Sequence, residues 1–164
     1  MSLFLAVIGA TAAALLEGMP YISVGSAHPH PVLVFGLVWA VAGRIEGALV
    51  WAFVGGIVLD ALANRPFGLS AFALLLAVGL GGLLSRGLVR IRPLVPVIAV
   101  ALLSGLYSVV QLLLMGAIRS PIPVADPLPM LLPGIAYDIV LAILFGPLAV
   151  AVHDRYAEQE RLDW

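Results

Sequence analysis

The chain has 164 residues, of which 63% are hydrophobic and only 10% are charged, and its mean hydropathy is +1.16. About a quarter of the residues in a soluble domain are charged, so this composition excludes an ordinary water-soluble fold. The net charge is −1 and lysine is absent, so the chain lacks the basic surface that nucleic-acid binding requires.

Charged residues and prolines divide the chain into six apolar blocks, at residues 2–16, 31–43, 47–63, 67–85, 93–118 and 131–152. A membrane-spanning helix needs about 20 residues, and the last four blocks are long enough. The first block is short. The second block is the shortest, and it predicts either a tilted short helix or a re-entrant segment.

Only helices and closed barrels satisfy their backbone polar groups in lipid. The blocks are unbroken, whereas the strands of a barrel alternate in hydrophobicity. The sequence therefore predicts an all-α integral membrane protein, a bundle of six transmembrane helices or of five plus a re-entrant segment. One transmembrane domain is expected over residues 1–153, followed by a short charged tail at 154–164.

The arginines predict the orientation, because cytoplasmic loops are enriched in basic residues. With six spans, one side of the membrane holds Arg44, Arg86, Arg90, Arg92, Arg155 and Arg161, and the other holds Arg65 and Arg119. The C-terminus is therefore predicted to be cytoplasmic. Arg86, Arg90 and Arg92 form a basic patch on that side, whose side chains either reach lipid headgroups or form a docking surface.

The fifth block carries a polar stripe of Ser104, Tyr107, Ser108 and Gln111. The i, i+3, i+4, i+7 spacing places these side chains on one face of a helix, and that face should turn away from lipid. Two interpretations follow: hydrogen bonds between packed helices, or the wall of a polar pocket.

Carboxylates within membrane helices mark candidate functional sites. Asp60, Gln111 and Asp138 each lie a few residues from the outer end of their blocks, so they share a depth. Arg65 and Arg119 follow just beyond, where their charges could neutralise the carboxylates. We expect a structural polar cluster in which Arg65 lies near enough to neutralise Asp60; a ligand or ion site and a partner contact are the alternatives.

Four further side chains receive simpler interpretations. His28 and His30 flank a proline, and two ligands without a nearby carboxylate make a weak metal site, so an exposed loop is expected. Trp39 and Trp51 are expected to be interfacial anchors. No metal or cofactor is assigned.

Two stripes of small residues recur at intervals of four, and such stripes allow helices to approach closely. They serve either packing inside the bundle or contact with a partner's transmembrane helix. The stripes are Ala6, Ala10 and Ala14 in the first block, and Ala73, Ala77 and Gly81 in the fourth.

Catalytic motifs are absent from the sequence. It contains no nucleophile–base pair, HExxH motif, Walker loop or Rossmann fingerprint. An enzyme is therefore not expected.

The third and fourth blocks carry a pattern of six residues: Trp51, Phe53, Gly56, Asp60, Pro66 and Gly68. With the layout of short apolar blocks, this pattern resembles the MreD family of rod-shape-determining membrane proteins. That family has an aromatic-Phe-x-x-Gly-Leu-x-x-Asp stretch followed by a Pro-Leu-Gly turn. This chain departs from the pattern at Ile57 and Phe67, where leucine is usual.

The resemblance implies a non-catalytic scaffold of bacterial cell-wall elongation, multi-pass in the cytoplasmic membrane. The implied partners are MreC, the MreB actin homologue, and RodA with its class B penicillin-binding protein. From surface chemistry, the alanine stripes are expected to face the MreC helix and the basic patch to face MreB.

The alternative is the substrate-binding S component of an energy-coupling-factor vitamin transporter. Such proteins also have six spans, and they dock their coupling subunit through small-residue stripes, which Ala6, Ala10 and Ala14 would fit. The outer loops offer few polar or aromatic side chains to hold a vitamin, and residue two is Ser, where the nickel/cobalt subtype has His.

Overall fold

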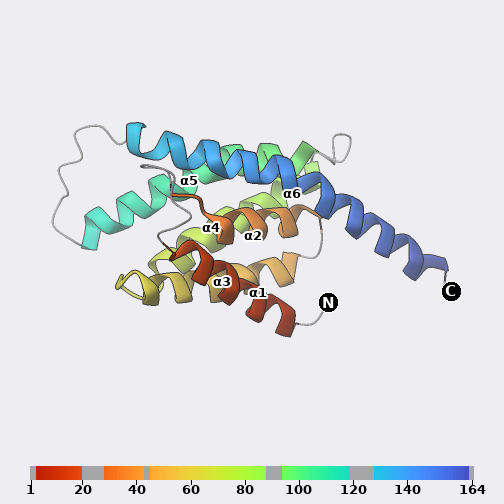
Figure 1. Ribbon diagram of the computed structural model, residues 1–164, viewed down its shortest axis with the longest axis horizontal. Coiled ribbons are helices and arrows are strands. Elements are labelled where there is room, and N and C mark those ends of the chain that lie inside the picture. Colours follow the sequence, from red (N-terminus) through yellow and green to blue (C-terminus); the bar gives the residue numbers. More distant parts are fainter. Residues whose placement is uncertain (1–2, 20–27, 43–44, 88–93, 119–127, 163–164) are drawn as a thin grey trace.

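The computed structural model describes residues 3–19, 28–42, 45–87, 94–118 and 128–162, with backbone alone at residues 3, 5, 87, 128–130 and 152–162. In this part of the chain the secondary structure is entirely helical, which confirms the all-α prediction. The helices are α1 (Leu3–Glu17), α2 (Pro31–Ala42), α3 (Ile45–Leu62), α4 (Leu69–Gly87), α5 (Val95–Ile118) and α6 (Leu128–Leu162). Figure 1 shows them running back and forth along one direction, so that the α3–α4 turn, the start of α2 and the end of α5 share one end of the bundle.

Within the described residues, four helices are long and apolar enough to cross a membrane: α3, α4, α5 and the segment Leu131–Ala151 of α6. Helices α1 and α2 are apolar but shorter. Beyond Ala151, α6 continues as a helix to Leu162, so the predicted tail begins as an extension of the last helix.

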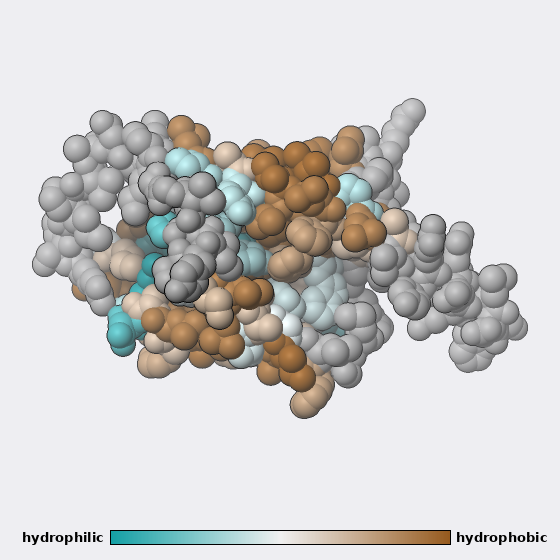
Figure 2. Space-filling model, viewed as in Figure 1, coloured by the Kyte–Doolittle hydropathy of each residue, from teal (hydrophilic) through white to brown (hydrophobic). Residues whose placement is uncertain are grey.

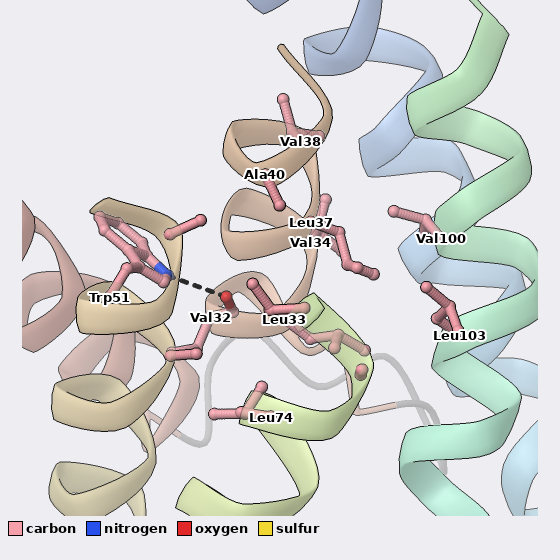
Figure 3. Close-up of a cluster of buried hydrophobic side chains, with 14 of the residues drawn as sticks. Val32, Leu33, Val34, Leu37, Val38, Ala40, Trp51, Leu74, Val100 and Leu103 are labelled. Carbon is pink, nitrogen blue, oxygen red and sulfur yellow. Dashed lines mark hydrogen bonds between the residues drawn. The ribbon is translucent and has the colours of Figure 1, made fainter. Parts of the chain in front are cut away.

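Helix α2 lies at the centre of the bundle and contacts every other helix. Its 12 residues extend about 18 Å, which is less than the roughly 30 Å hydrocarbon core. Ten of the 12 are buried, and Val34, Leu37 and Val38 pack into the core drawn in Figure 3. Since protein surrounds α2, its uniformly apolar sequence is explained by burial in the core, and the segment is a short helix.

Large apolar side chains cover the outside of the bundle. Phe4, Phe53 and Leu113 are each more than half exposed, and Figure 2 shows hydrophobic residues spread over the middle of the molecule. A water-soluble protein rarely exposes apolar patches of this extent, so these faces fit contact with lipid.

The first small-residue stripe lies inside the bundle. Ala6, Ala10 and Ala14 are at most 1% exposed, on the face of α1 that packs on α3. A Cβ added at Gly55 of α3 would lie 3.7 Å from the Cβ of Ala10 and 2.5 Å from a methyl of Val32. Small residues on both helices thus permit their close approach.

The second stripe is buried in the same way. Ala73 and Ala77 are at most 1% exposed, and a Cβ at Gly81 would lie 2.6 Å from Leu37 of α2. Both stripes therefore serve internal packing. Of the two expected uses of the stripes, the structure shows packing inside the bundle, and neither stripe presents an open face in the isolated chain.

Trp51 is also a core residue, and its assignment as an interfacial anchor is wrong. It is 9% exposed, and its indole N–H donates to the carbonyl oxygen of Val32 at 2.9 Å (Figure 3). Trp39 meets it edge to face at 5.8 Å between ring centroids. The indole packs between α1, α2 and α3, because a Cβ at Gly9 would lie 2.6 Å from its ring.

Candidate functional site

The turn between α3 and α4 is built around Asp60. Asn64 adopts a φ of 50°, and the N–H of Arg65 donates to the carbonyl oxygen of Asp60 at 3.0 Å, as in a Schellman helix end. Gly68, at a φ of 95°, then turns the chain into α4. This left-handed conformation favours glycine.

The Asp60 side chain is completely buried and caps the next helix. Its carboxylate accepts the backbone N–H groups of Gly68 at 2.8 Å and of Ser70 at 2.9 Å. A carboxylate in this position satisfies N–H groups that have no partner within the helix and interacts favourably with the helix dipole. Asp60 is thus a structural residue of the α3–α4 hairpin.

Arg65 does not pair with Asp60 as expected. Its guanidinium instead donates to Oε1 of Gln111 at 3.4 Å, and the Asp60 carboxylate is satisfied by backbone groups. Arg65 is only half-buried at the end of the bundle, whereas Asp60 is buried inside it.

Asp138 forms a second buried junction, between α5, α6 and the residue before α2. It is completely buried and accepts the backbone N–H of His30 at 2.8 Å. Its other oxygen lies 3.0 Å from Nδ1 of His30 and accepts the hydroxyl of Ser104. The ion pair joins a 21% exposed imidazole to a fully buried carboxylate.

Gln111 joins the two junctions. Its Nε2 donates to the hydroxyl of Ser70 at 3.1 Å and to the hydroxyl of Tyr107 at 2.7 Å. The Tyr107 ring meets the His30 ring edge to face at 5.4 Å. Hydrogen bonds therefore connect Arg65 and Gln111 to the Asp60 junction through Ser70, and the contact between the Tyr107 and His30 rings places the Asp138 junction beside them. Arg119 lies outside the described residues.

The polar stripe of α5 serves both of its predicted purposes. Ser104 and Gln111 make hydrogen bonds to other helices, whereas Ser108 bonds the carbonyl of Ser104 within α5. Tyr107 and Gln111 also line a cavity.

This cavity opens at the end of the bundle beside the α3–α4 turn and has a volume of about 320 Å³. Figure 2 shows hydrophilic residues gathered at this end. Its polar lining comes from Glu17, His28, His30, Arg65, Tyr107 and Gln111, and its apolar lining includes Met19, Leu59 and Leu62.

Sequence reasoning missed three members of the site. His30, expected in an exposed loop, is the ionic partner of Asp138. Burial lowers the pKa of His30, but Asp138 and Glu17 together raise it by more, so the pKa lies above the usual 6.5. Glu17 accepts the N–H of Val32 at 3.2 Å, and Ser70 bonds Gln111. His30 and Glu17 lie at the block ends nearest the polar cluster. Counting residues from the block ends, as for Asp60 and Asp138, would have placed them at the same depth.

The basic patch is described only in part. Arg86 is exposed in the last turn of α4, and Arg90 and Arg92 lie outside the described residues. Among the residues that the structure does describe, no three His, Cys, Asp or Glu side chains converge as a metal site would require.

The fold and site define a class: a helical membrane protein whose buried polar cluster locks one end of the bundle beside a small cavity. No protein-family model, curated protein or solved structure matches the chain.

Proposed function

We propose that this protein is a non-catalytic scaffold of the MreD type, in the cytoplasmic membrane of a bacterium and part of the machinery that elongates the cell wall. It would bind MreC in the membrane and connect it to MreB and to RodA with its class B penicillin-binding protein. The C-terminus would be cytoplasmic, since six arginines fall on its side and two on the other.

The observation that carries the proposal is the structural role of the motif shared with MreD. Gly56 lies against α4 so closely that a Cβ there would approach the Cα of Ala71 to 2.3 Å. Asp60 caps α4, and Gly68 supplies the positive φ of the turn. These residues build a rigid helical hairpin, which is what a scaffold needs to present fixed surfaces.

The two buried carboxylates support a role without catalysis. Asp60 is occupied by backbone N–H groups, and Asp138 by His30 and Ser104. Catalytic acids and bases must exchange protons with a substrate, whereas both of these groups are enclosed in the bundle.

The partner surfaces follow from what remains accessible. With the alanine stripes buried, the MreC helix would contact lipid-facing apolar side chains of the outer helices. The basic patch of Arg86, Arg90 and Arg92 would face MreB on the cytoplasmic side.

The test is co-purification and cell shape. The tagged protein is expressed with MreC, solubilised in mild detergent and isolated, and the same gene is introduced into rod-shaped cells depleted of MreD. We expect MreC to co-purify with the wild-type protein and rod shape to return. The Asp60→Ala variant should be defective in both assays. The control Glu46→Gln changes an exposed residue at the other end of α3 and should behave as wild type. Absence of both MreC and shape rescue for a well-folded wild-type protein would sink the proposal.

A second candidate is the S component of an energy-coupling-factor transporter, and the cavity at the polar end of the bundle favours it. A thermal-shift screen against vitamins and Co²⁺ discriminates the two. Reproducible stabilisation by one of these ligands, with no MreC bound, would replace the scaffold proposal.

A further inference from the structure

The cavity at the polar end is of a size that suits a small ligand. Its volume of about 320 Å³ lies at the lower end of the range of about 300–1,000 Å³ for ligand pockets. The walls come from the end of α1, the residues before α2, the α3–α4 turn and the middle of α5. Hydrogen bonds of Asp60, Asp138, Gln111 and Glu17 tie these elements together.

Two opposite charges line this cavity without pairing with each other. Glu17 and Arg65 are both half-buried lining residues, yet the one ion pair within the described residues joins His30 to Asp138. Burial raises the pKa of the Glu17 carboxyl to about 7 even with the charge of His30 acting on it, so its ionised form is costly in this site. A ligand ammonium group would stabilise that ionised form, and an anionic group on the same ligand would compensate the charge of Arg65.

Both groups retain hydrogen-bonding capacity. One Glu17 oxygen accepts the N–H of Val32, which leaves the other oxygen for a donor. Arg65 has five N–H donors, and one of them bonds Gln111. A carboxylate suits an ammonium group, and a guanidinium suits a carboxylate or phosphate.

His28 and His30 also line the cavity, and the His30 imidazole is already bonded to Asp138. The other lining side chains supply neutral contacts. The amide of Gln111 already donates to the hydroxyl of Tyr107. Apolar surface is provided by Met19, Leu59 and Leu62. A short aliphatic linker between the two charged groups of a ligand would lie against these apolar side chains.

We infer that the cavity binds a small zwitterion whose ammonium contacts Glu17 and whose anionic group contacts Arg65. A free compound of the phosphoethanolamine type and the headgroup of phosphatidylethanolamine share this chemistry. The scaffold proposal assigns no ligand, so this inference stands or falls separately from MreC binding.

Two measurements on the purified full-length protein test the inference. The first is thermal unfolding with O-phosphoethanolamine at about pH 8, above the pKa of about 7 to which burial raises the Glu17 carboxyl. The second is native mass spectrometry after exchange into micelles containing phosphatidylethanolamine or phosphatidylglycerol. Stabilisation by the soluble compound identifies a free ligand, and selective retention of phosphatidylethanolamine alone identifies the lipid; either result supports the inference.

Charge-neutralising variants locate the site. Glu17→Gln and Arg65→Gln should each weaken binding roughly ten- to a hundredfold, the loss expected for one charge-assisted hydrogen bond. Glu46→Gln, at the far end of α3, should bind as wild type. Circular dichroism of each variant checks that the fold persists.

The inference would be overturned by no response to either ligand, by wild-type binding in Glu17→Gln or Arg65→Gln, or by equal stabilisation with ethyl phosphate, which lacks the ammonium group. A variant that loses its fold is replaced by its conservative form, Glu17→Asp or Arg65→Lys, in which binding should be weakened but measurable. Undiminished binding by both conservative and neutral forms also counts against it.

Discussion

The carboxylate of Asp60 accepts the backbone N–H of Ser70 at 2.9 Å, and this bond fastens the last turn of α3 to the first turn of α4. A second bond, from the N–H of Gly68, reaches the same carboxylate. The two helices therefore enter the bundle as one hairpin, with the turn between them fixed at both ends.

Replacement of Asp60 by alanine should destabilise the protein by about 2 kcal/mol or more, because it removes a helix cap and leaves N–H groups without an acceptor. We expect a lower yield of monodisperse protein and a lower melting temperature in detergent. The fluorescence of buried Trp51 offers a direct probe of unfolding.

The matched control for this change is Glu46→Gln, which alters an exposed carboxylate in the first turn of α3. It should shift the melting temperature very little. A wild-type melting temperature and yield in Asp60→Ala would show that the cap contributes nothing.

The sequence predicted the helices well because a membrane imposes a simple rule on them. Unbroken apolar blocks must be helical, and breaks at charges and prolines locate their ends within a few residues, as for the block at 47–63 and α3 (Ile45–Leu62). The burial of α2 was harder to foresee. A helix enclosed by protein and a helix facing lipid are both apolar, so hydrophobicity alone does not separate them.

The sequence predicted the depth of the site residues in the membrane, but it did not predict their hydrogen-bond partners. Counting residues from the block ends placed Asp60, Gln111 and Asp138 together, and they share one cluster. The partners of Asp60 were not predictable from charge, since backbone N–H groups compete with Arg65 for its oxygens and carry no sequence signature. His30 contacts Asp138 across 108 positions of sequence, and the packing of α2 against α6 decides that contact.

Gly56→Ala should destabilise the hairpin by about 1–3 kcal/mol. The new methyl would lie 2.3 Å from the Cα and 2.5 Å from the backbone N of Ala71, so α3 and α4 would have to move apart. Gly79→Ala is the control, because a Cβ there meets nothing within 4 Å and alanine favours helix by up to about 1 kcal/mol. Equal melting temperatures for the two variants would contradict the close packing of α3 on α4.

Ala10→Leu should reduce the folded fraction of the protein even when no partner is present. Ala10 is completely buried between α1 and α3, so extra side-chain volume should cost about 1–3 kcal/mol. Ala12→Leu, on an exposed position of the same helix, should leave the melting temperature close to wild type. If Ala10→Leu folds normally but loses MreC, the stripe is a partner face after all.

The His30–Asp138 pair predicts that stability depends on pH. Burial lowers the pKa of His30, but the hydrogen bond and charge of Asp138 and the charge of Glu17 raise it more, so the folded state holds the proton above the usual 6.5. A histidine with a raised folded-state pKa contributes its full stability below the unfolded pKa and loses it as pH rises through the folded pKa. The melting temperature should therefore fall as pH increases above 6.5.

His30→Gln should flatten this pH dependence above about pH 7, because glutamine can occupy the site without carrying a titrating charge. Below that pH the slope keeps a contribution from Glu17, whose pKa burial raises to about 7. The change would also lower the melting temperature at acidic pH, where the ion pair is complete, and differ less from wild type at alkaline pH. His28→Gln is the histidine control, since its side chain is exposed, and it should keep the wild-type slope. A slope above about pH 7 that survives in His30→Gln would assign the pH dependence to other groups.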